Sequence, residues 1–238
     1  MSHLRQYIRN ILKERLNFDR LHNLALYEGN WGGSKLYFLY AIDFIKEVSD
    51  ANSPTGEMAS YSLGQKSENL YGMISLTEPS QGCNGAMIVE LSRAKDGWGP
   101  TMYDIAMSLH PDGIISDRVT VSSEAFRLWK YYKERRSDVN AYPLDHYTEE
   151  YTEYEGDDCP PGSDGDYLPD DFDYGRRQED WLEDPLSWSY SREPIPEIHT
   201  LKKNHEFAQD LAFDYDLELT EEFWIKAARG FFNSHDEV

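Results

Sequence analysis

The pattern of apolar and polar positions divides the chain into short elements separated by turns rich in Gly, Pro and Ser. Apolar residues three and four positions apart predict helices over residues 3–16, 99–109, 122–136, 200–213 and 220–233. Short apolar runs bounded by Gly or Pro predict strands over residues 70–77, 85–92 and 113–116. The aromatic run 35–45 predicts a buried strand, or a strand and a turn, after the turn residues 29–34. Residues 49–69 are rich in Ser, Asn and Gly and are predicted to form a loop.

The helix predicted over 122–136 has the clearest ends in the sequence. Ser122 is a suitable N-cap, and Arg and Lys fill the last turn, where the helix dipole favours cations. The helix predicted over 99–109 follows Gly97 and has Pro100 in its first turn. Together with the predicted strands, the middle of the chain therefore has the order strand, glycine turn, helix, strand, helix.

The composition allows a folded core and restricts the partners. Of the 238 residues, 39% are hydrophobic, and the formal net charge is -21. That charge opposes binding to nucleic-acid phosphates and to an anionic membrane, and it favours basic proteins. No apolar run reaches the roughly 20 residues of a membrane span, and the N-terminus has no signal-peptide pattern. We therefore expect a soluble intracellular protein that has a protein partner and binds neither nucleic acid nor membrane.

Residues 145–184 hold 16 acidic residues against two arginines, together with many Tyr, Pro and Gly. A segment of this composition buries too little apolar surface to order itself, so we predict a solvated, irregular acidic insertion. Its Tyr and Trp side chains also suit a segment that covers the domain or a partner. The Asp residues within 164–173 lack the EF-hand order, and His199 and His205 lack zinc-site spacing, so no metal site is predicted.

The two cysteines, Cys83 and Cys159, lie far apart in the sequence. Thiols of intracellular proteins are kept reduced. We therefore expect two free thiols in a reducing compartment.

Residues 93–100, Arg-Ala-Lys-Asp-Gly-Trp-Gly-Pro, have the composition of an anion-binding turn. A turn of backbone N–H groups that leads into a helix N-terminus can bind a pyrophosphate, because the helix dipole favours negative charge there. Glycine is needed where a Cβ would keep the backbone away from the phosphate. The segment lies between a predicted strand and a predicted helix, as this chemistry requires.

The same region resembles the acyl-CoA N-acyltransferases of the GNAT superfamily. The family's pyrophosphate turn reads Gln/Arg-x-x-Gly-x-Gly/Ala, which Gly97 and Gly99 match and Ala94 does not. A later family motif, Asn-x-x-Ala-x-x-Leu-Tyr, resembles residues 122–129, with Trp129 in place of the Tyr that often serves as general acid. The resemblance implies an α+β fold with a GNAT-like central mixed sheet flanked by helices. The acidic irregular insertion and the C-terminal helices are additions to that core.

The resemblance also implies roles for a set of residues in binding acetyl-CoA or another acyl-CoA. The cofactor is expected to contact the glycine turn at Arg93, Lys95, Gly97, Trp98 and Gly99. Glu90 is the candidate base for an amine, and Tyr131 or Tyr132 is the candidate general acid. The amine substrate is expected to contact Tyr103, Asp104, Asp117 and Arg118. Simpler roles stay open, because Asp104 also suits the dipole of a first helical turn, and Asp117 with Arg118 also suits a structural pair.

Residues 85–232 are further similar to a GNAT-like protein widespread in tailed bacteriophages. The motifs that carry this similarity are Gly-x-Gly-Pro-x-x-Tyr-Asp, Ser-Asp-Arg and Arg-Ser-Asp-Val. It implies a location in the host cytoplasm or packaging in the virion, with other phage proteins or a basic host protein as partners. The expected function is transfer of an acyl group from acyl-CoA to an amine. The alternative is a catalytically inactive protein of this fold that acts as a virion component or as an acidic inhibitor of a host factor.

The sequence features divide the chain into four parts. They are an N-terminal amphipathic helical segment (1–28), a GNAT-like core (29–144), an acidic segment rich in Tyr and Asp (145–198) and a C-terminal helical pair (199–238). The N-terminal segment is the most basic part of the chain, which suits either a packing helix or a docking or packaging signal.

Overall fold

The computed structural model describes residues 23–50, 67–79, 82–117, 121–145, 156–159, 183–215 and 217–233. The helix predicted over 3–16 lies outside the described residues, as do most of the acidic segment and most of the predicted loop 49–69. Within the described ranges, no helix has the length and apolar character needed to cross a membrane.

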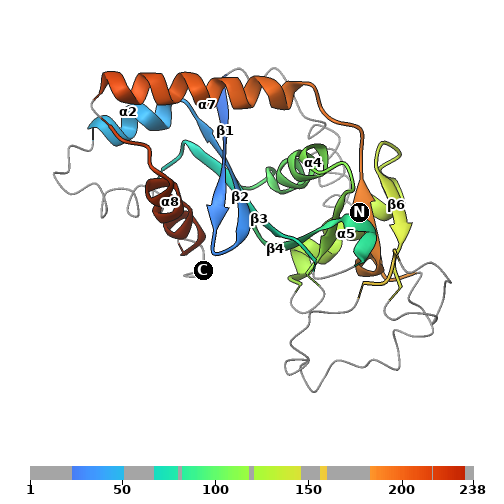
Figure 1. Ribbon diagram of the computed structural model, residues 1–238. Coiled ribbons are helices and arrows are strands. Elements are labelled where there is room, and N and C mark those ends of the chain that lie inside the picture. The colour runs from blue at the N-terminus through green and yellow to red at the C-terminus, as the bar shows by residue number, and fades with distance from the viewer. Residues whose placement is uncertain are drawn as a thin grey trace, which may run out of the picture. The chain divides into compact units, whose positions relative to one another are not determined.

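Seven strands form one mixed sheet in the order β1-β2-β3-β4-β5-β7-β6 (Figure 1). The strands are β1 (Leu24–Trp31), β2 (Ser34–Ala41), β3 (Leu70–Thr77), β4 (Met87–Ala94), β5 (Ile114–Ser116), β6 (Asn140–Pro143) and β7 (Trp188–Ser191). β4 and β5 run parallel, whereas the pairs β1–β2, β5–β7 and β6–β7 are antiparallel. The five helices of the described ranges are α2 (Asp43–Asp50), α4 (Gly99–Leu109), α5 (Ser123–Arg135), α7 (Glu197–Asp214) and α8 (Glu221–Asn233). The predicted α+β class with a mixed sheet is confirmed.

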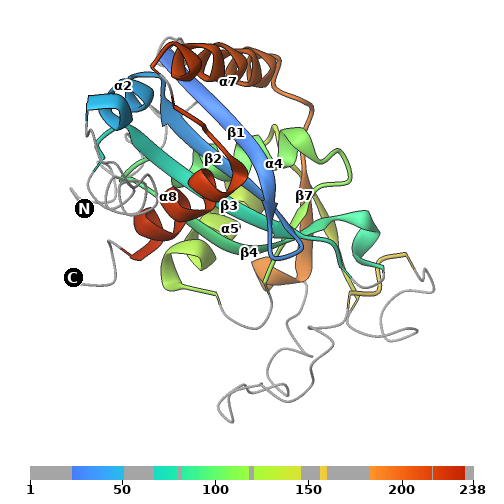
Figure 2. The ribbon, with the colours of Figure 1, turned by 60° about the vertical axis from the view of Figure 1, so that its left-hand side comes forward.

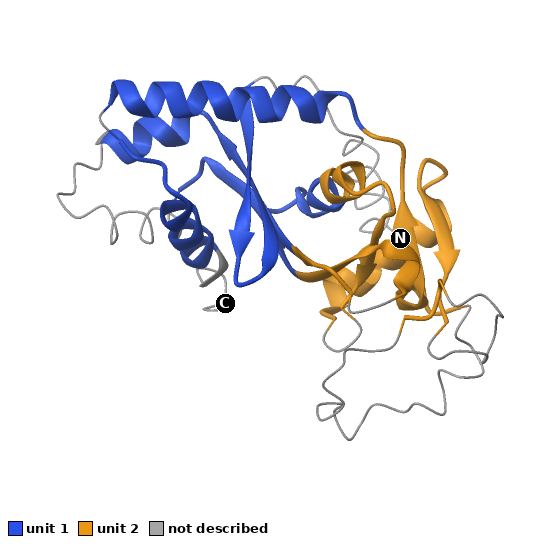
Figure 3. Ribbon diagram, viewed as in Figure 1, with its two compact units in different colours: residues 1–75, 91–103, 195–238 blue, residues 76–90, 104–194 orange. Residues whose placement is uncertain are grey.

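The chain forms two compact units (Figure 3). Unit 1 consists of residues 1–75, 91–103 and 195–238, and unit 2 consists of residues 76–90 and 104–194. β3, β4 and α4 each contribute residues to both units, so the division follows packing and not the ends of elements.

In unit 1, β1 and β2 form a hairpin in which Trp31 pairs with Ser34 and Leu24 pairs with Ala41. The turn predicted over 29–34 is confined to Gly32 and Gly33, because β1 continues through Trp31. The helical assignment of residues 1–28 is wrong for residues 24–28, which belong to β1 and pair with β2. The aromatic run after the turn is a strand up to Ala41, and α2 then follows where the sequence predicted the rest of the run and the start of a loop.

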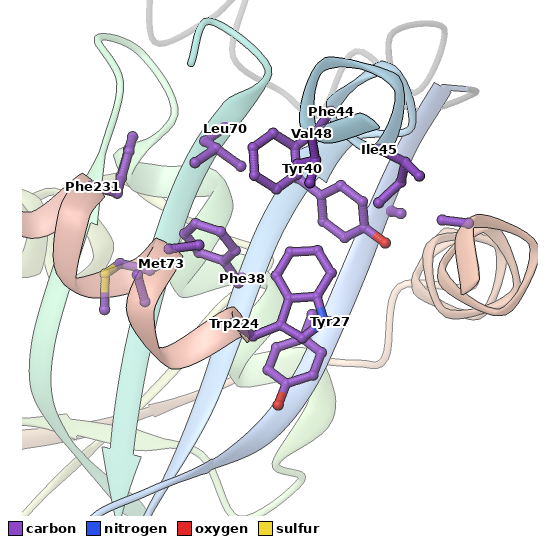
Figure 4. Close-up of a cluster of buried hydrophobic side chains, with 14 of the residues drawn as sticks. Tyr27, Phe38, Tyr40, Phe44, Ile45, Val48, Leu70, Met73, Trp224 and Phe231 are labelled. Carbon is purple, nitrogen blue, oxygen red and sulfur yellow. The ribbon is translucent and has the colours of Figure 1, made fainter. Parts of the chain in front are cut away.

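The core of unit 1 is aromatic, and α8 supplies its central side chain (Figure 4). Trp224 is fully buried, stacks on Tyr27 at 4.9 Å between ring centroids and lies 5.9 Å from the ring of Phe38. Figure 2 shows α8 lying across the strands of the hairpin, and α7 contacts β1. Both C-terminal helices were predicted, and Thr220 opens α8 by accepting a hydrogen bond from the N–H of Phe223 at 3.2 Å.

In unit 2, α5 forms where the sequence predicted it. The Ser122 side chain caps the helix by accepting a hydrogen bond from the N–H of Ala125 at 3.2 Å. Trp129 and Tyr132 are buried on one face of α5, and the Trp129 ring lies 5.1 Å from that of Tyr190 on β7. The apolar stripe of this helix therefore packs against the sheet.

Two strands of unit 2 were missed by the sequence analysis. β7 lies within the stretch predicted to be irregular, and β6 precedes it in a stretch without a prediction. Each has only four residues, and their pairing, Asn140 with Ser191 through Pro143 with Trp188, joins segments distant in sequence. Strands this short carry little periodicity of their own and depend on their partners.

The prediction of two free thiols is wrong, because Cys83 and Cys159 form a disulfide. Their Cα atoms lie 4.5 Å apart although 76 residues separate them in sequence. Both cysteines are buried in a small core with Ile115 and Leu144. The sequence places no constraint on such a pairing, since only the packing of unit 2 brings the two segments together.

Candidate functional site

The predicted glycine turn connects β4 to α4 within unit 1. β4 ends at Ala94, the turn covers residues 95–98, and α4 begins at Gly99. Gly97 has a φ of 83°, a left-handed conformation that side chains with a Cβ rarely adopt. At Gly99 the space around the backbone is open, since an added Cβ would meet no atom within 4 Å. The space beside the Cα of Gly99, at the start of α4, is therefore open.

Lys95 and Trp98 are held against β3 by Tyr71. The Lys95 N–H donates to the Tyr71 carbonyl at 2.9 Å, and its ammonium lies 5.1 Å from the Tyr71 ring centroid. The same ammonium donates to the Glu68 carbonyl oxygen. The Trp98 ring lies 4.6 Å from the Tyr71 ring. Partial burial lowers the pKa of Lys95, although nearby carboxylates act in the opposite direction.

Arg93 and Tyr103 complete the predicted site residues of unit 1. Arg93 is half-buried on β4. Tyr103 is buried in the first half of α4, and desolvation raises the pKa of its phenol to about 12 against the opposing hydrogen bond with Ser92. Tyr103 is therefore neutral and packed into the unit.

In unit 2, Asp104 lies at the centre of an ion network. It is 3% exposed, and both of its carboxylate oxygens accept hydrogen bonds from the Arg136 guanidinium at 3.1–3.3 Å. Arg192 lies 3.2 Å from the same carboxylate. Asp138 pairs with Arg136 at 2.7 Å and lies 3.4 Å from Arg192. Each of the two aspartates therefore contacts both arginines. Hydrogen bonding to Arg136 lowers the pKa of Asp138 to about 2.

Tyr132, a candidate general acid, belongs to this network. Its hydroxyl donates to Asp104 at 3.3 Å, and its ring lies 5.2 Å from the guanidinium carbon of Arg136. Tyr131 is half-buried next to it, with the two ring centroids 6.0 Å apart. The structure thus brings together Tyr132 and Asp104, which the sequence had assigned to different roles.

The two arginines of the network were missed as site residues. Arg136 begins the Arg-Ser-Asp-Val motif that also contains Asp138, and Arg192 directly follows β7. The pairing of an Arg with an Asp in that motif was the available signal. It pointed to an ion pair, but gave no means of finding Arg192 or Asp104 as the other partners.

The remaining predicted residues lie along β4 and after β5. Glu90 is exposed on β4. Asp117 is half-buried directly after β5, and its N–H donates to the Val89 carbonyl at 3.2 Å. Arg118 lies outside the described residues. The parallel register of the two strands runs from Met87 opposite Ile114 and ends at Val89 opposite Ser116.

No metal-binding group of three or more His, Cys, Asp or Glu side chains exists among the described residues. His205 instead lies in the aromatic core of unit 1, where its Nδ1 is 2.7 Å from the Tyr40 hydroxyl. Burial lowers the pKa of His205 to about 4, so its ring is neutral at pH 7. The chain matches no protein-family model, no curated protein and no solved structure.

Proposed function

We propose that this chain is a GNAT-like phage protein that binds an acyl-CoA, such as acetyl-CoA, through the turn between β4 and α4. The observation that carries the proposal is the open start of α4 at Gly99, which follows a left-handed Gly97 at the end of a strand. Backbone N–H groups at a helix N-terminus favour the negative charge of a pyrophosphate. Gly97, Gly99 and the start of α4 all lie in unit 1.

Acyl transfer at this cofactor requires a base for the incoming amine. The amine nitrogen forms a bond to the thioester carbonyl carbon, the carbon–sulfur bond breaks, and the CoA thiolate leaves. From the resemblance alone, Glu90, which is exposed on β4, is assigned to take the amine proton. Tyr132 is not assigned to reprotonate the thiolate, because its hydroxyl is committed to buried Asp104.

Calorimetric titration of the full chain with acetyl-CoA tests the binding. Gly99→Glu places a negative charge in open space at the helix start, so we expect affinity to fall about tenfold or more while the fold is kept. Gly99→Ala is the matched control, since its Cβ also meets open space and adds no charge. Absence of binding to the unaltered chain at millimolar acetyl-CoA, or equal affinity of the Gly99→Glu variant, contradicts the proposal.

A second candidate function is a non-catalytic role for the same fold, as a virion component or as an acidic protein that binds a basic host factor. The ion network favours this non-catalytic role, because the Tyr132 hydroxyl donates to Asp104 and Asp104 also pairs with two arginines. These two predicted site residues therefore have structural partners. Turnover of acetyl-CoA with amine acceptors distinguishes the two functions, with Glu90→Gln as the inactive reference. Binding without turnover, together with recovery of the protein from purified virions by mass spectrometry, favours the non-catalytic role.

A further inference from the structure

Three short segments of unit 2 meet around the disulfide and are called the clasp below. They are residues 82–85, 144–145 and 156–159. The N–H of Cys83 donates to the Asp158 carbonyl at 2.8 Å, and the N–H of Asn84 donates to the Gly156 carbonyl at 2.7 Å. The first segment is thus joined to the third by two backbone hydrogen bonds as well as by the covalent bond.

The second segment holds residues 156–159 in the same way. The N–H of Asp145 donates to the Asp157 carbonyl at 3.0 Å, and the N–H of Cys159 donates to the Asp145 carbonyl at 2.7 Å. The two cysteines then close a small core with Ala86, Ile115 and Leu144. Four backbone hydrogen bonds and one disulfide therefore anchor a four-residue stretch.

The backbone of the first segment is strained. All four residues have a positive φ, of 61° at Gly82, 56° at Cys83, 55° at Asn84 and 74° at Gly85. Two of them carry a Cβ, for which this conformation is unfavourable. A Cβ at Gly82 would lie 1.8 Å from the Asp158 carbonyl oxygen, so the third segment passes directly against this turn. Strained backbone of this kind persists only where surrounding contacts hold it.

We propose that the clasp is a redox-responsive device, which goes beyond the proposed function. A dithiol reductant attacks the Cys83–Cys159 bond and supplies two electrons and two protons, which yields two protein thiols and the oxidised cyclic disulfide of the reductant. Without the covalent bond, the turn 82–85 relaxes toward right-handed backbone and gives up its hydrogen bonds to residues 156–159. Relief of the backbone strain favours this release.

Residues 156–159 lie within the stretch 145–184, which holds 16 acidic residues. Oxidation fixes residues 156–159 to the body of unit 2, and reduction removes that anchor. The redox state of this disulfide thus decides whether residues 156–159 are anchored to residues 82–85.

Hydrogen exchange followed by mass spectrometry on the full chain, oxidised or reduced with dithiothreitol, tests the clasp. The amides of Cys83, Asn84, Asp145 and Cys159 donate the four hydrogen bonds of the clasp. We expect reduction to accelerate amide exchange about tenfold or more in the peptides that contain these residues. The β1–β2 hairpin, which lies in unit 1, serves as the internal control and should exchange unchanged. The double variant Cys83→Ser with Cys159→Ser should match the reduced protein and ignore dithiothreitol.

Asn84→Gly tests the role of backbone strain, because it removes a Cβ from a left-handed position. In this variant, reduction should accelerate exchange about fivefold less than in the unaltered chain. Three results overturn the proposal: unchanged exchange at the clasp after reduction, equal acceleration in the β1–β2 hairpin, or two free thiols on titration of the unreduced, denatured protein. Equal acceleration would make the disulfide a staple of the whole fold and not a local device.

Discussion

At the residue scale, the carboxylate of Asp104 holds two guanidinium groups from different elements. Arg136 is the C-cap that follows α5 and Arg192 follows β7, whereas Asp104 lies on α4. All three side chains are largely withdrawn from water, which makes each charge dependent on its partners. Asp104 therefore joins α4 to the end of α5 and to the end of β7. It does not lie in the first turn of α4, where a carboxylate would interact with the helix dipole.

Replacing Asp104 should test this role directly. Asp104→Ala leaves two buried cations without their carboxylate, so the free energy of unfolding in urea should fall by about 3–5 kcal/mol. Glu134→Ala breaks an exposed ion pair with Lys130 in the same unit and should cost less than about 1 kcal/mol. Equal effects of the two substitutions would refute a structural role for Asp104. If Asp104→Ala does not fold, the isosteric Asp104→Asn is measured instead.

Tyr132→Phe separates a structural from a catalytic role for the phenol. The ring stays in the core, and only the 3.3 Å hydrogen bond to Asp104 is lost, so stability should fall by about 1 kcal/mol. If the hydroxyl is not the proton donor, any acetyl transfer measured for the unaltered chain should change less than about twofold. A loss of about a hundredfold with intact folding would show that Tyr132 acts in the chemistry.

At the element scale, the start, the end and the buried face of α5 can be predicted from residues that are neighbours in the sequence. Its start is fixed by Ser122, and its cationic last turn contains Lys133 and Arg135. Its apolar stripe places Trp129 and Tyr132 on the buried face. These signals lie within one turn or one face of the element, so the sequence identified them without knowledge of the sheet.

Removing the cap should weaken α5 by a known amount. Ser122→Ala deprives the N–H of Ala125 of its acceptor, so the free energy of unfolding should fall by about 1 kcal/mol. Ser123→Ala, one residue later, changes an exposed hydroxyl that bonds only locally to Glu124, and should shift stability by less than about 0.5 kcal/mol. Urea titration of both variants measures the difference, and equal values would argue against capping by Ser122.

At the scale of the whole molecule, stability depends on pH through groups in both units. His205 in unit 1 has a pKa of about 4 when folded, against an ordinary value of 6.5, because burial disfavours its charged form. Asp138 in unit 2 has a pKa of about 2 against 3.8, because it accepts from Arg136. In both cases the unfolded chain binds its proton at a higher pH than the folded chain, so acid favours unfolding.

Acidification should therefore destabilise the protein in two windows. The stability that depends on neutral His205 is complete above pH 6.5 and is lost as the pH falls toward 4. The contribution of Asp138 is lost only below pH 3.8. Urea unfolding across the first window measures the slope, and His205→Asn should flatten it. An unchanged slope in that variant would assign the acid sensitivity to other groups.

The sequence by itself determined the elements whose signals are local. The helices over 99–109 and 122–136, the strand over 70–77 and the two C-terminal helices were predicted, because periodicity, caps and glycine turns are properties of neighbouring residues. It also located the turn before α4, since Gly97 has a left-handed φ that residues with a Cβ rarely adopt.

The tertiary structure decided everything that depends on residues meeting across long stretches of chain. It paired Cys83 with Cys159 over 76 residues, and it gave Asp104 its two arginines. It made strands of β6 and β7, which are too short to be recognised without each other. In each case the physical reason is the same: the free energy comes from a partner that local sequence does not specify.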